Sequence, residues 1–235
     1  MISIVVPNYN HSFLLPLLMK SYNRHPFKDD EVEMIIVDDC SEDPFLEMLR
    51  LSLKYVKPWF TVKAFETGQR TTNPCKPLNI AVKKSRGDII LINSMDVMPA
   101  TDVLPAIHKA HKETSNLYLM PKLYIDMCCT EWQETCACVS MARKMYEELG
   151  GWDERYRYIG MEDLDFLWRV KESGYIMKRD PSMVYMHINA MFVPKIFNMK
   201  EHEEIFNDTH KVKKITKVNP DGWGELDTLE EVKIR

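Results

Sequence analysis

Residues 1–10 read MISIVVPNYN, an almost unbroken apolar and β-branched run that ends at Pro7 in a polar turn. Further short apolar runs and helix-period segments then alternate along the first half of the chain. This alternation is typical of βαβ units, whose strands lie parallel in one sheet. The sequence therefore predicts an α/β protein with a mostly parallel central sheet. The expected strands are 2–6, 34–37, 61–65 and 88–92, and the expected helices are 12–22, 44–55 and 77–85.

The second half continues with less regular periodicity. A helix is expected from Thr101 and another at 163–173, in which Leu164, Leu167, Trp168 and Lys171 form the predicted inner stripe. Ser12 and Asp43 are expected to cap the first two helices, because their side-chain oxygens accept from free helical N–H groups. Residues 191–235 are charged and weakly amphipathic, which predicts a helical extension. The remaining expected elements are a short helix at 143–149 and strands at 117–125, 137–141 and 185–188.

The composition limits which classes of protein this chain can belong to. With 235 residues, 45% of them hydrophobic, the chain can bury one substantial core. A net charge of −4 argues against nucleic acid as a main partner. No apolar run is long enough to cross a bilayer, and the first residues lack the basic region of a signal peptide, so a cytoplasmic protein is expected. The crowded Cys128, Cys129, Cys136 and Cys138 contain no CxxC pair, so reduced thiols are favoured over a zinc site.

Acidic residues follow two of the predicted strands. Asp38 and Asp39 come after strand 34–37, and Asp96 comes after strand 88–92. Ligands of parallel sheets bind outside the carboxyl ends of the strands, where such carboxylates can accept from a nucleobase or hold a metal ion. Two alternatives with a purely structural role stay open. Asp38 and Asp39 would also serve to cap the next helix with Ser41, and His187, on the apolar strand 185–188, would also fit as a core residue.

A third acidic group, Glu162, Asp163 and Asp165, opens the helix at 163–173. Acids in a first turn are stabilised by the helix dipole, which offers a purely electrostatic reason for them. The approach is the glycine-flexed, aromatic segment 150–160, which contains Trp152 and is of the kind that stacks on sugar faces. A carboxylate here is placed to take a proton from an acceptor hydroxyl.

Taken together, these motifs resemble the inverting, GT-A-fold glycosyltransferases of family two over about residues 1–190. The matching segments, in unbroken order, are IVVPNYN at 4–10, IVDDCS at 36–41, NIA at 79–81 before RGD at 86–88, Asp96, and GGWDE at 150–154 before Glu162-Asp163. The resemblance implies a Rossmann-like, three-layer α/β/α fold. It also implies transfer of a sugar from a UDP-sugar to an acceptor hydroxyl, with inversion and with Mn²⁺ or Mg²⁺ as cofactor.

The resemblance also implies roles for individual residues. Asp163 would be the general base, with Glu162 beside it, and Trp152 and Asp165 would contact the acceptor or the sugar. Asp96 would be the last acid of the family's DxD metal motif, whose first acid is replaced by Ser94, and His187 would join it on the metal. Arg70 lies in the loop where family members contact the diphosphate. The nucleotide would be bound by Pro7, Asn8, Asp38, Asp39, Lys76, Asn79, Ser94 and Met95, with Asp39 reading uracil.

We therefore expect residues 1–190 to form the transferase domain, with a nucleotide-binding half at 1–98 and an acceptor-binding half at 99–190. The extension at 191–235 is a candidate surface for homo-oligomer contacts. A glycan or another hydroxyl compound is the expected acceptor. Two rivals stay open: a nucleotide-sugar or glycan-binding module that has lost catalysis, suggested by Ser94, and a sugar nucleotidyltransferase, which would need a glycine-rich basic loop after the first strand.

Overall fold

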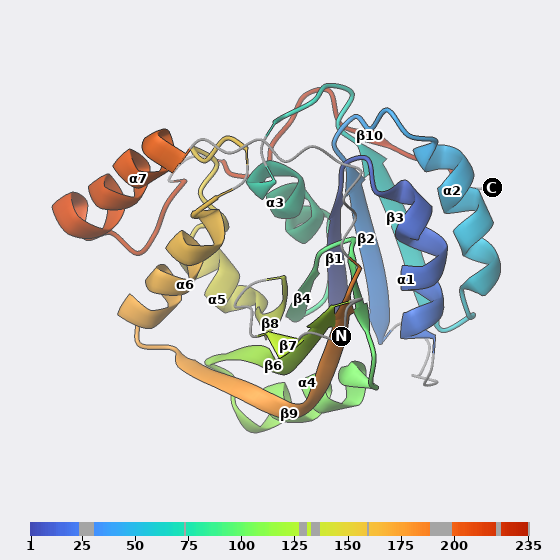
Figure 1. Cartoon of the computed structure of the whole chain (residues 1–235), viewed down its shortest axis with the longest axis horizontal. Helices are drawn as coiled ribbons and strands as arrows, with labels where there is room; N and C mark the ends of the chain where they lie inside the picture. Colours follow the sequence, from blue (N-terminus) through green and yellow to red (C-terminus); the bar gives the residue numbers. More distant parts are fainter. Residues whose placement is uncertain are drawn as a thin grey trace.

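The computed structural model describes residues 1–23, 31–72, 74–126, 131–132, 137–158, 160–188, 199–219 and 222–234. Cys128, Cys129 and Cys136, expected as reduced thiols, lie outside these ranges. Within them, one mixed sheet runs through the whole molecule in the order β10-β3-β2-β1-β4-β8-β6-β9-β5, with β7 paired to β6 (Figure 1). The sheet crosses the predicted division at residue 98 without a break, because β4 pairs with β8.

The centre of the sheet is parallel and fully enclosed. β1 (Ile2–Asn8) lies between β2 (Val32–Asp38) and β4 (Ile89–Asn93), and β3 (Phe60–Glu66) pairs with the far side of β2, all in parallel register. Strands covered on both faces are read from the sequence as apolar runs, which is why the first half was predicted closely. The carboxyl ends of β1, β2 and β3 are therefore brought to one edge, since Asn8 pairs with Asp38 and Asp38 with Glu66.

Helices cover both faces, so the three-layer α/β/α prediction is confirmed (Figure 1). One core contains Leu18 of α1 (Leu15–Tyr22), Leu49 of α2 (Phe45–Ser52) and Ile107 of α4 (Val103–Glu113). The other contains Ile80 of α3 (Cys75–Lys84), Met145 of α5 (Arg143–Glu148) and Phe166 of α6 (Glu162–Glu172). Among the described residues, no helix has the length and apolar character to span a bilayer.

The second half of the sheet is antiparallel except for one pair. β8 (Cys138–Ala142) runs antiparallel to β4 and to β6 (Leu117–Asp126), while β9 (Ile176–His187) runs parallel to β6. β9 starts nine residues before the predicted strand 185–188, because the sequence Asp180-Pro181-Ser182 resembles a turn. In the structure this segment is accommodated by a register shift against β6, where proline is tolerated in a strand. The remaining short strands are β5 (Val97–Pro99), β7 (Glu131–Trp132) and β10 (Glu230–Glu231).

Three local expectations are wrong. Ser12 does not cap the first helix, because it lies inside the 3-10 turn before α1 and neither this turn nor α1 has a side-chain cap. Asp43 does not cap α2; its carboxylate accepts from the backbone N–H and the hydroxyl of Ser12, both at 2.7 Å, and so holds the 3-10 turn Ser12–Leu14 that precedes α1. The inner face of α6 is also rotated relative to the prediction. Leu164 and Trp168 are about two-fifths exposed, and the buried residues of α6 are Glu162, Asp165, Phe166, Arg169 and Val170.

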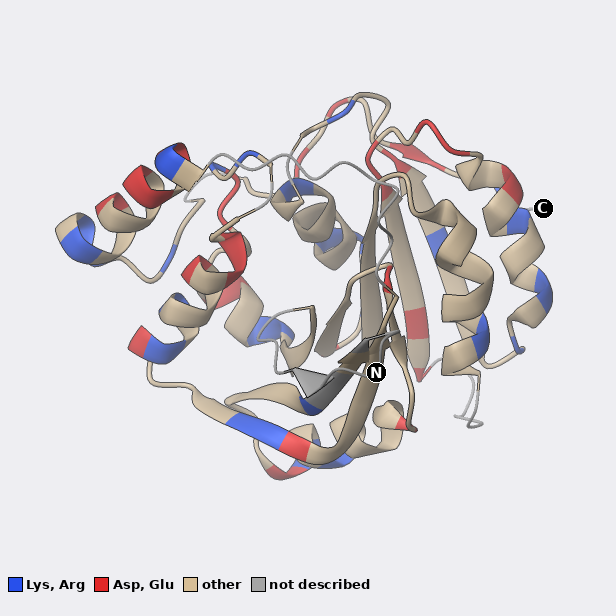
Figure 2. Ribbon diagram, in the orientation of Figure 1, with Lys and Arg blue, Asp and Glu red and all other residues tan. Residues whose placement is uncertain are grey.

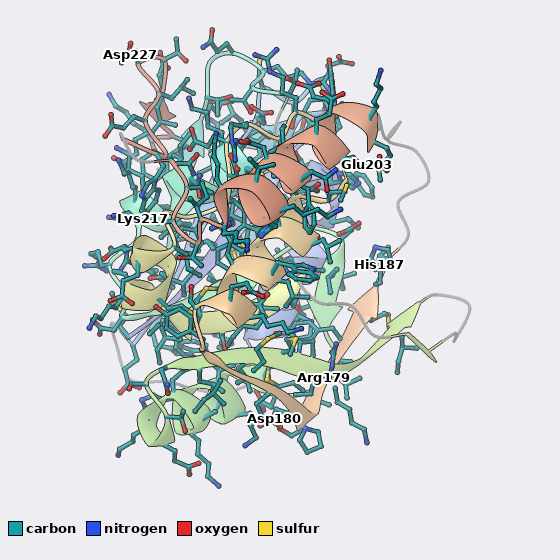
Figure 3. All side chains as sticks on the ribbon, turned by 90° about the vertical axis from the view of Figure 1, so that its left-hand side faces the viewer. Arg179, Asp180, His187, Glu203, Lys217 and Asp227 are labelled. Atoms are coloured by element: carbon teal, nitrogen blue, oxygen red, sulfur yellow. The ribbon has the colours of Figure 1, made fainter. Side chains whose placement is uncertain are left out.

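The C-terminal extension is helical only in its first part. α7 (Met199–Asn207) continues into a π-helical turn at Asp208–Lys213, and the described residues from 214 to 229 form neither helix nor strand. The chain then ends at the sheet, where β10 pairs antiparallel with β3. Figure 3 shows α7 lying beside α6 and the later segment running from Lys217 towards Asp227 along the side of the molecule. The extension is therefore a strap across the domain.

Candidate functional site

The loops after β1 and β2 are joined by a buried network around Asn8 and Asp38. The amide of Asn8 donates to the Asp38 carboxylate at 2.6 Å and to the Ser12 hydroxyl at 2.8 Å. Asp38 in turn accepts from the backbone N–H and the hydroxyl of Ser41. Because both Asn8 and Asp38 are almost fully buried, they shape the edge of the sheet rather than face solvent. Asp38 does not cap α2, which begins after Pro44 without a side-chain cap; its carboxylate instead holds Asn8 and Ser41 together.

Asp39 lies between this network and the loop after β3. Its backbone N–H donates to Asn8 O, and its carboxylate accepts from the backbone N–H of Thr71 at 2.8 Å and from the Thr71 hydroxyl at 3.0 Å. Burial raises the pKa of Asp39 to about 6, against the lowering effect of the Thr71 hydrogen bonds. The carboxylate is therefore a strong acceptor at the edge where three parallel strands end.

We call the loops that surround Asp39, after β1, β2 and β3, the Asp39 corner. Its outer side contains an aromatic ring and a cation. The Arg70 guanidinium lies over the Tyr9 ring, 4.1 Å from its centroid, which is within cation–π range. Pro7, near the end of β1, is half-buried. Lys76, in the first turn of α3, is 29% exposed and lies 3.8 Å from the Glu154 carboxylate, so its ammonium group is accessible.

Asp96 and His187 meet beyond β4, as expected from the resemblance. The pairing of β5 with β9 sets Val97 opposite His187, and the backbone N–H of Ile188 donates to Asp96 O at 2.7 Å. His187 Nε2 lies 3.1 Å from Asp96 Oδ2, and the two side chains are 16% and 18% exposed. Figure 3 shows His187 at the end of β9, away from Arg179 and Asp180 in the earlier part of the strand.

This pair fits a divalent cation. Carboxylate oxygen and imidazole nitrogen are ligands that Mn²⁺ accepts, and water and phosphate oxygens commonly complete such shells. Within the described ranges, no third His, Cys, Asp or Glu joins the two. Ser94, at the missing acid of the motif, is half-buried, and Met95 is 4% exposed and belongs to the core.

Glu162 and Asp163 open α6 from a constrained turn. Met161 precedes them with φ of +62°, and the Glu162 carboxylate accepts from the Gly160 N–H at 2.5 Å. Burial, followed by the Glu162 charge, raises the pKa of Asp163 to about 7, and burial also raises the pKa of Glu162. A carboxyl group with a pKa near neutrality is suited to accept a proton in a reaction. Figure 2 shows the acidic residues gathered along the approach to α6 and its first turn.

One hydrogen bond joins this turn to the Asp39 corner. The backbone N–H of Tyr158 donates to Thr72 O at 2.7 Å, next to the residue that binds Asp39. Tyr158 and Thr72 both have a positive φ. So do Asn10, Cys40 and Met161 in neighbouring loops of the site. Non-glycine residues held in this region cluster at functional sites. The segment before α6 and the loop after β3 therefore form one wall.

Three predicted site residues point into the protein instead. Trp152 is 2% exposed, and its ring stacks on Phe166 with centroids 3.7 Å apart, so no face is available to a sugar. Asp165 is fully buried, with Arg169 Nε at 2.8 Å and His210 Nε2 at 2.9 Å. The indole of Trp152 instead donates a hydrogen bond to Asp163. These residues support the site from behind.

Asn79 is the third. It is fully buried on α3, and its amide donates to Trp152 O and to the Glu154 carboxylate, both at 2.8 Å. Its carbonyl oxygen accepts from Trp152 N and from the Tyr146 hydroxyl. All its hydrogen-bonding groups are used by the protein, so the predicted contact with nucleotide is replaced by a role in holding the 150–154 loop.

Several residues of the site were missed in the sequence. Arg169 follows Asp165 by four residues on a predicted helix, a spacing that indicates an ion pair. Thr71, which binds Asp39, and Asn219 and His210 of the extension gave no signal, because their partners lie more than 30 residues away in the chain.

Comparison with known proteins matches this architecture. The profile of the family described as Glycosyl transferase family 2 matches residues 3–168. A poly(ribitol-phosphate) beta-N-acetylglucosaminyltransferase TarS of Staphylococcus aureus is 31% identical over 94 residues, 40% of this chain and 16% of TarS. A poly(ribitol-phosphate) beta-glucosyltransferase of Bacillus spizizenii is 30% identical over 122 residues, 52% of this chain and 19% of that protein.

Solved structures share the fold. S. aureus TarS 1-349 in complex with UDP superposes with a TM-score of 0.65 at 16% identity, covering 91% of this chain and 72% of the other. The mannosyltransferase PcManGT from Pyrobaculum calidifontis, in complex with GDP-Man and Mn²⁺, gives 0.66 at 16% identity, covering 93% and 66%. The curated relatives are several times longer than their aligned segments. Since the family profile covers well over half of the sequence, the chain belongs to glycosyl transferase family 2.

Proposed function

We propose that this chain transfers a sugar from a UDP-sugar to an acceptor hydroxyl with inversion at the anomeric carbon. The observation that carries the proposal is the Tyr158–Thr72 hydrogen bond, because it sets the segment leading to Asp163 against the loop that binds Asp39. A donor that reaches from Asp39 towards the start of α6 would present its sugar to a carboxyl group with a pKa near 7. Family membership and the UDP complex of TarS support the same reading.

The nucleotide would bind at the ends of β1 and β2. The Asp39 carboxylate, ionised above about pH 6, accepts from the N3–H of uracil, while Pro7 and Tyr9 border the ring. Asn8 and Asp38 contribute by fixing the loops rather than by direct contact. The accessible Lys76 and Arg70 supply positive charge for the diphosphate.

Asp96 and His187 would hold Mn²⁺ or Mg²⁺. When bound, the ion neutralises charge that develops on the diphosphate leaving group. Ser94 replaces the first acid of the motif, so these two side chains supply all the protein ligands that the described residues offer. The Mn²⁺ in the complex of PcManGT supports a metal in this fold.

Asp163 would act as the general base. It removes the proton from the acceptor hydroxyl while that oxygen forms a bond to the anomeric carbon, and the bond from this carbon to the diphosphate oxygen breaks to release UDP. Glu162 raises the pKa of Asp163 and is itself fixed by Gly160 N–H. Since both curated relatives are named for poly(ribitol-phosphate), a phosphate-linked polyol is the first acceptor to test.

The test is UDP release with Mn²⁺, a panel of UDP-sugars and polyol-phosphate acceptors. Asp163→Asn should bind UDP as well as wild type and lose turnover by about 100-fold or more, the usual worth of a general base. Asp180→Asn is the control, because Asp180 lies in the first half of β9, away from His187, and its carboxylate accepts from the backbone N–H and the hydroxyl of its neighbour Ser182. Full turnover in Asp163→Asn would refute the assignment.

A second candidate is a binding module without catalysis. The observation that favours it is Ser94, which leaves one carboxylate at the metal motif. Tight UDP-sugar binding with Mn²⁺ and no UDP release from the wild-type protein, with any acceptor tested, would establish this alternative.

A further inference from the structure

The part of the strap that follows α7 contacts the segment that leads to the proposed base, Asp163. The backbone N–H of Val218 donates to Leu149 O, and Val218 is 2% exposed. Gly150, with φ of +73°, passes so close that a side chain there would collide with Val218 O. Only glycine fits this crossing, because any other residue would meet both the carbonyl and a left-handed backbone. The strap is thus packed tightly onto the 149–154 loop.

Asn219, the next residue, binds this loop at three points. Its amide donates to Gly150 O at 2.9 Å and to Trp152 O at 2.6 Å, and its side-chain oxygen accepts from Glu154 N at 3.1 Å. Its φ is +48°, a conformation that asparagine tolerates better than most residues. One side chain of the extension therefore fixes both sides of Trp152.

Trp152 passes this constraint to Asp163. Its ring is locked against Phe166 at an interplanar angle of 11°, and its indole N–H is the hydrogen bond donor to the Asp163 carboxylate. Phe166 lies three residues after Asp163 on the same helix, so the ring and the carboxylate are held by one element. The stacked ring and the hydrogen bond together hold the indole against the carboxylate.

We propose that Asn219 and Trp152 are positioning residues for glycosyl transfer, and that the C-terminal strap is therefore part of the catalytic apparatus. The inference rests on the proposed role of Asp163 as base. Asn219 holds the main chain of Trp152, and Trp152 orients the base for the acceptor hydroxyl. A misplacement of about 1 Å in such a constellation costs on the order of 100-fold in rate.

Asn79 also helps to hold the main chain of Trp152, because it binds both Trp152 O and Trp152 N. Loss of Asn219 should therefore have a smaller effect than loss of the indole N–H. We expect Trp152→Phe, which keeps an aromatic ring on Phe166, to lower kcat by about 100-fold, and Asn219→Gly, which keeps the positive φ, to lower it by about 10-fold. The KM for the UDP-sugar should stay within about 2-fold, because Asn219 and Trp152 bond to the 150–154 loop, Asn79 and Asp163 rather than to the loop that binds Asp39.

The pH profile separates positioning from general loss of structure. The Trp152 hydrogen bond lowers the pKa of Asp163, whereas burial and Glu162 raise it. Asp163 also acts on the Cys75 thiol of α3, whose pKa burial and the neighbouring carboxylates raise well above its usual value, so this thiol stays neutral. Trp152→Phe should therefore move the acidic limb of kcat/KM to higher pH, while Asn219→Gly moves it less.

The experiment measures kcat, KM and pH limbs for wild type, Trp152→Phe, Asn219→Gly and the control Glu225→Gln, with UDP binding and melting temperature for each. Glu225 is also in the strap, but it pairs with Lys83 at the surface, so its variant should behave as wild type. Wild-type kcat in both test variants would overturn the inference, as would equal losses of UDP binding and kcat. If wild type turns over but Asp163→Asn is equally active, the proposed function fails first.

Discussion

Substitution of Asp165 distinguishes its predicted contact with the acceptor from the structural role that it has in the fold. We predict that Asp165→Asn destabilises the protein strongly. The carboxylate is fully buried and binds Arg169 Nε at 2.8 Å, while Arg169 is itself fully buried. Asparagine would remove the negative charge opposite that guanidinium and leave it, among the described residues, the carbonyls of Leu149 and Gly151 as acceptors.

Breaking a buried ion pair by removing one partner costs about 3–5 kcal/mol. For a chain of this size each kcal/mol shifts the melting temperature by about 2–4 °C, so a fall of about 6–20 °C is expected. Thermal unfolding followed by circular dichroism measures it. Asp208→Asn is the matched control, because it removes an ion-paired carboxylate of the extension that solvent reaches, and it should leave the melting temperature almost unchanged.

The pH dependence of this effect has a defined sign. Burial alone would raise the pKa of Asp165, but the His210 hydrogen bond and the Arg169 charge lower it below 3.8 in the folded protein. Its contribution is therefore complete above pH 3.8 and is lost as pH falls through the lower folded value. The wild-type advantage should shrink only in that acidic range. An Asp165→Asn protein with wild-type stability and impaired transfer would refute this reasoning and restore the acceptor contact.

Three further outcomes follow from the site. Because Asp163 must be ionised to act as base and its pKa is about 7, kcat/KM should rise with pH through neutrality and level off above it. UDP affinity should weaken as pH falls below about 6, where Asp39 becomes protonated, and titration calorimetry of an Asp39→Asn variant should lack this step. Asp96→Ala and His187→Ala should each weaken Mn²⁺ binding in the presence of UDP by about 10-fold or more, while the exposed His108→Ala should not. Equal Mn²⁺ affinity in all three variants would remove the metal assignment.

The parallel half of the fold was predictable from the sequence for a physical reason. β1, β2 and β4 are covered on both faces, so their burial forces continuous apolar runs, and their predicted bounds differ from the structure by at most two residues at either end. The Asp96–His187 contact was implied by the resemblance, and it forms because β5 and β9 pair with Val97 opposite His187.

The orientation of α6 and the course of the extension were not predictable in the same way. Apolar periodicity favoured Leu164 and Trp168 as the inner face, but the buried face carries Asp165 and Arg169, which neutralise each other and so can replace apolar residues. Periodicity detects apolar burial and misses a paired charge. The strap after α7 is held by Asn219, whose bonds to main-chain atoms leave no pattern in composition.

The acidic start of α6 is divided into two roles by its surroundings. Asp163 and Asp165 are two residues apart on one helix, yet the pKa of Asp163 is raised to about 7 and that of Asp165 is lowered. Burial acts on both in the same direction, so the difference comes from the partners: Glu162 repels charge at Asp163, whereas Arg169 and His210 attract it at Asp165. Environments that drive neighbouring carboxyl groups apart in this way separate a proton acceptor from a fixed anion. His210 belongs to the extension, and the anion it helps to fix also anchors the helix that carries the proposed base.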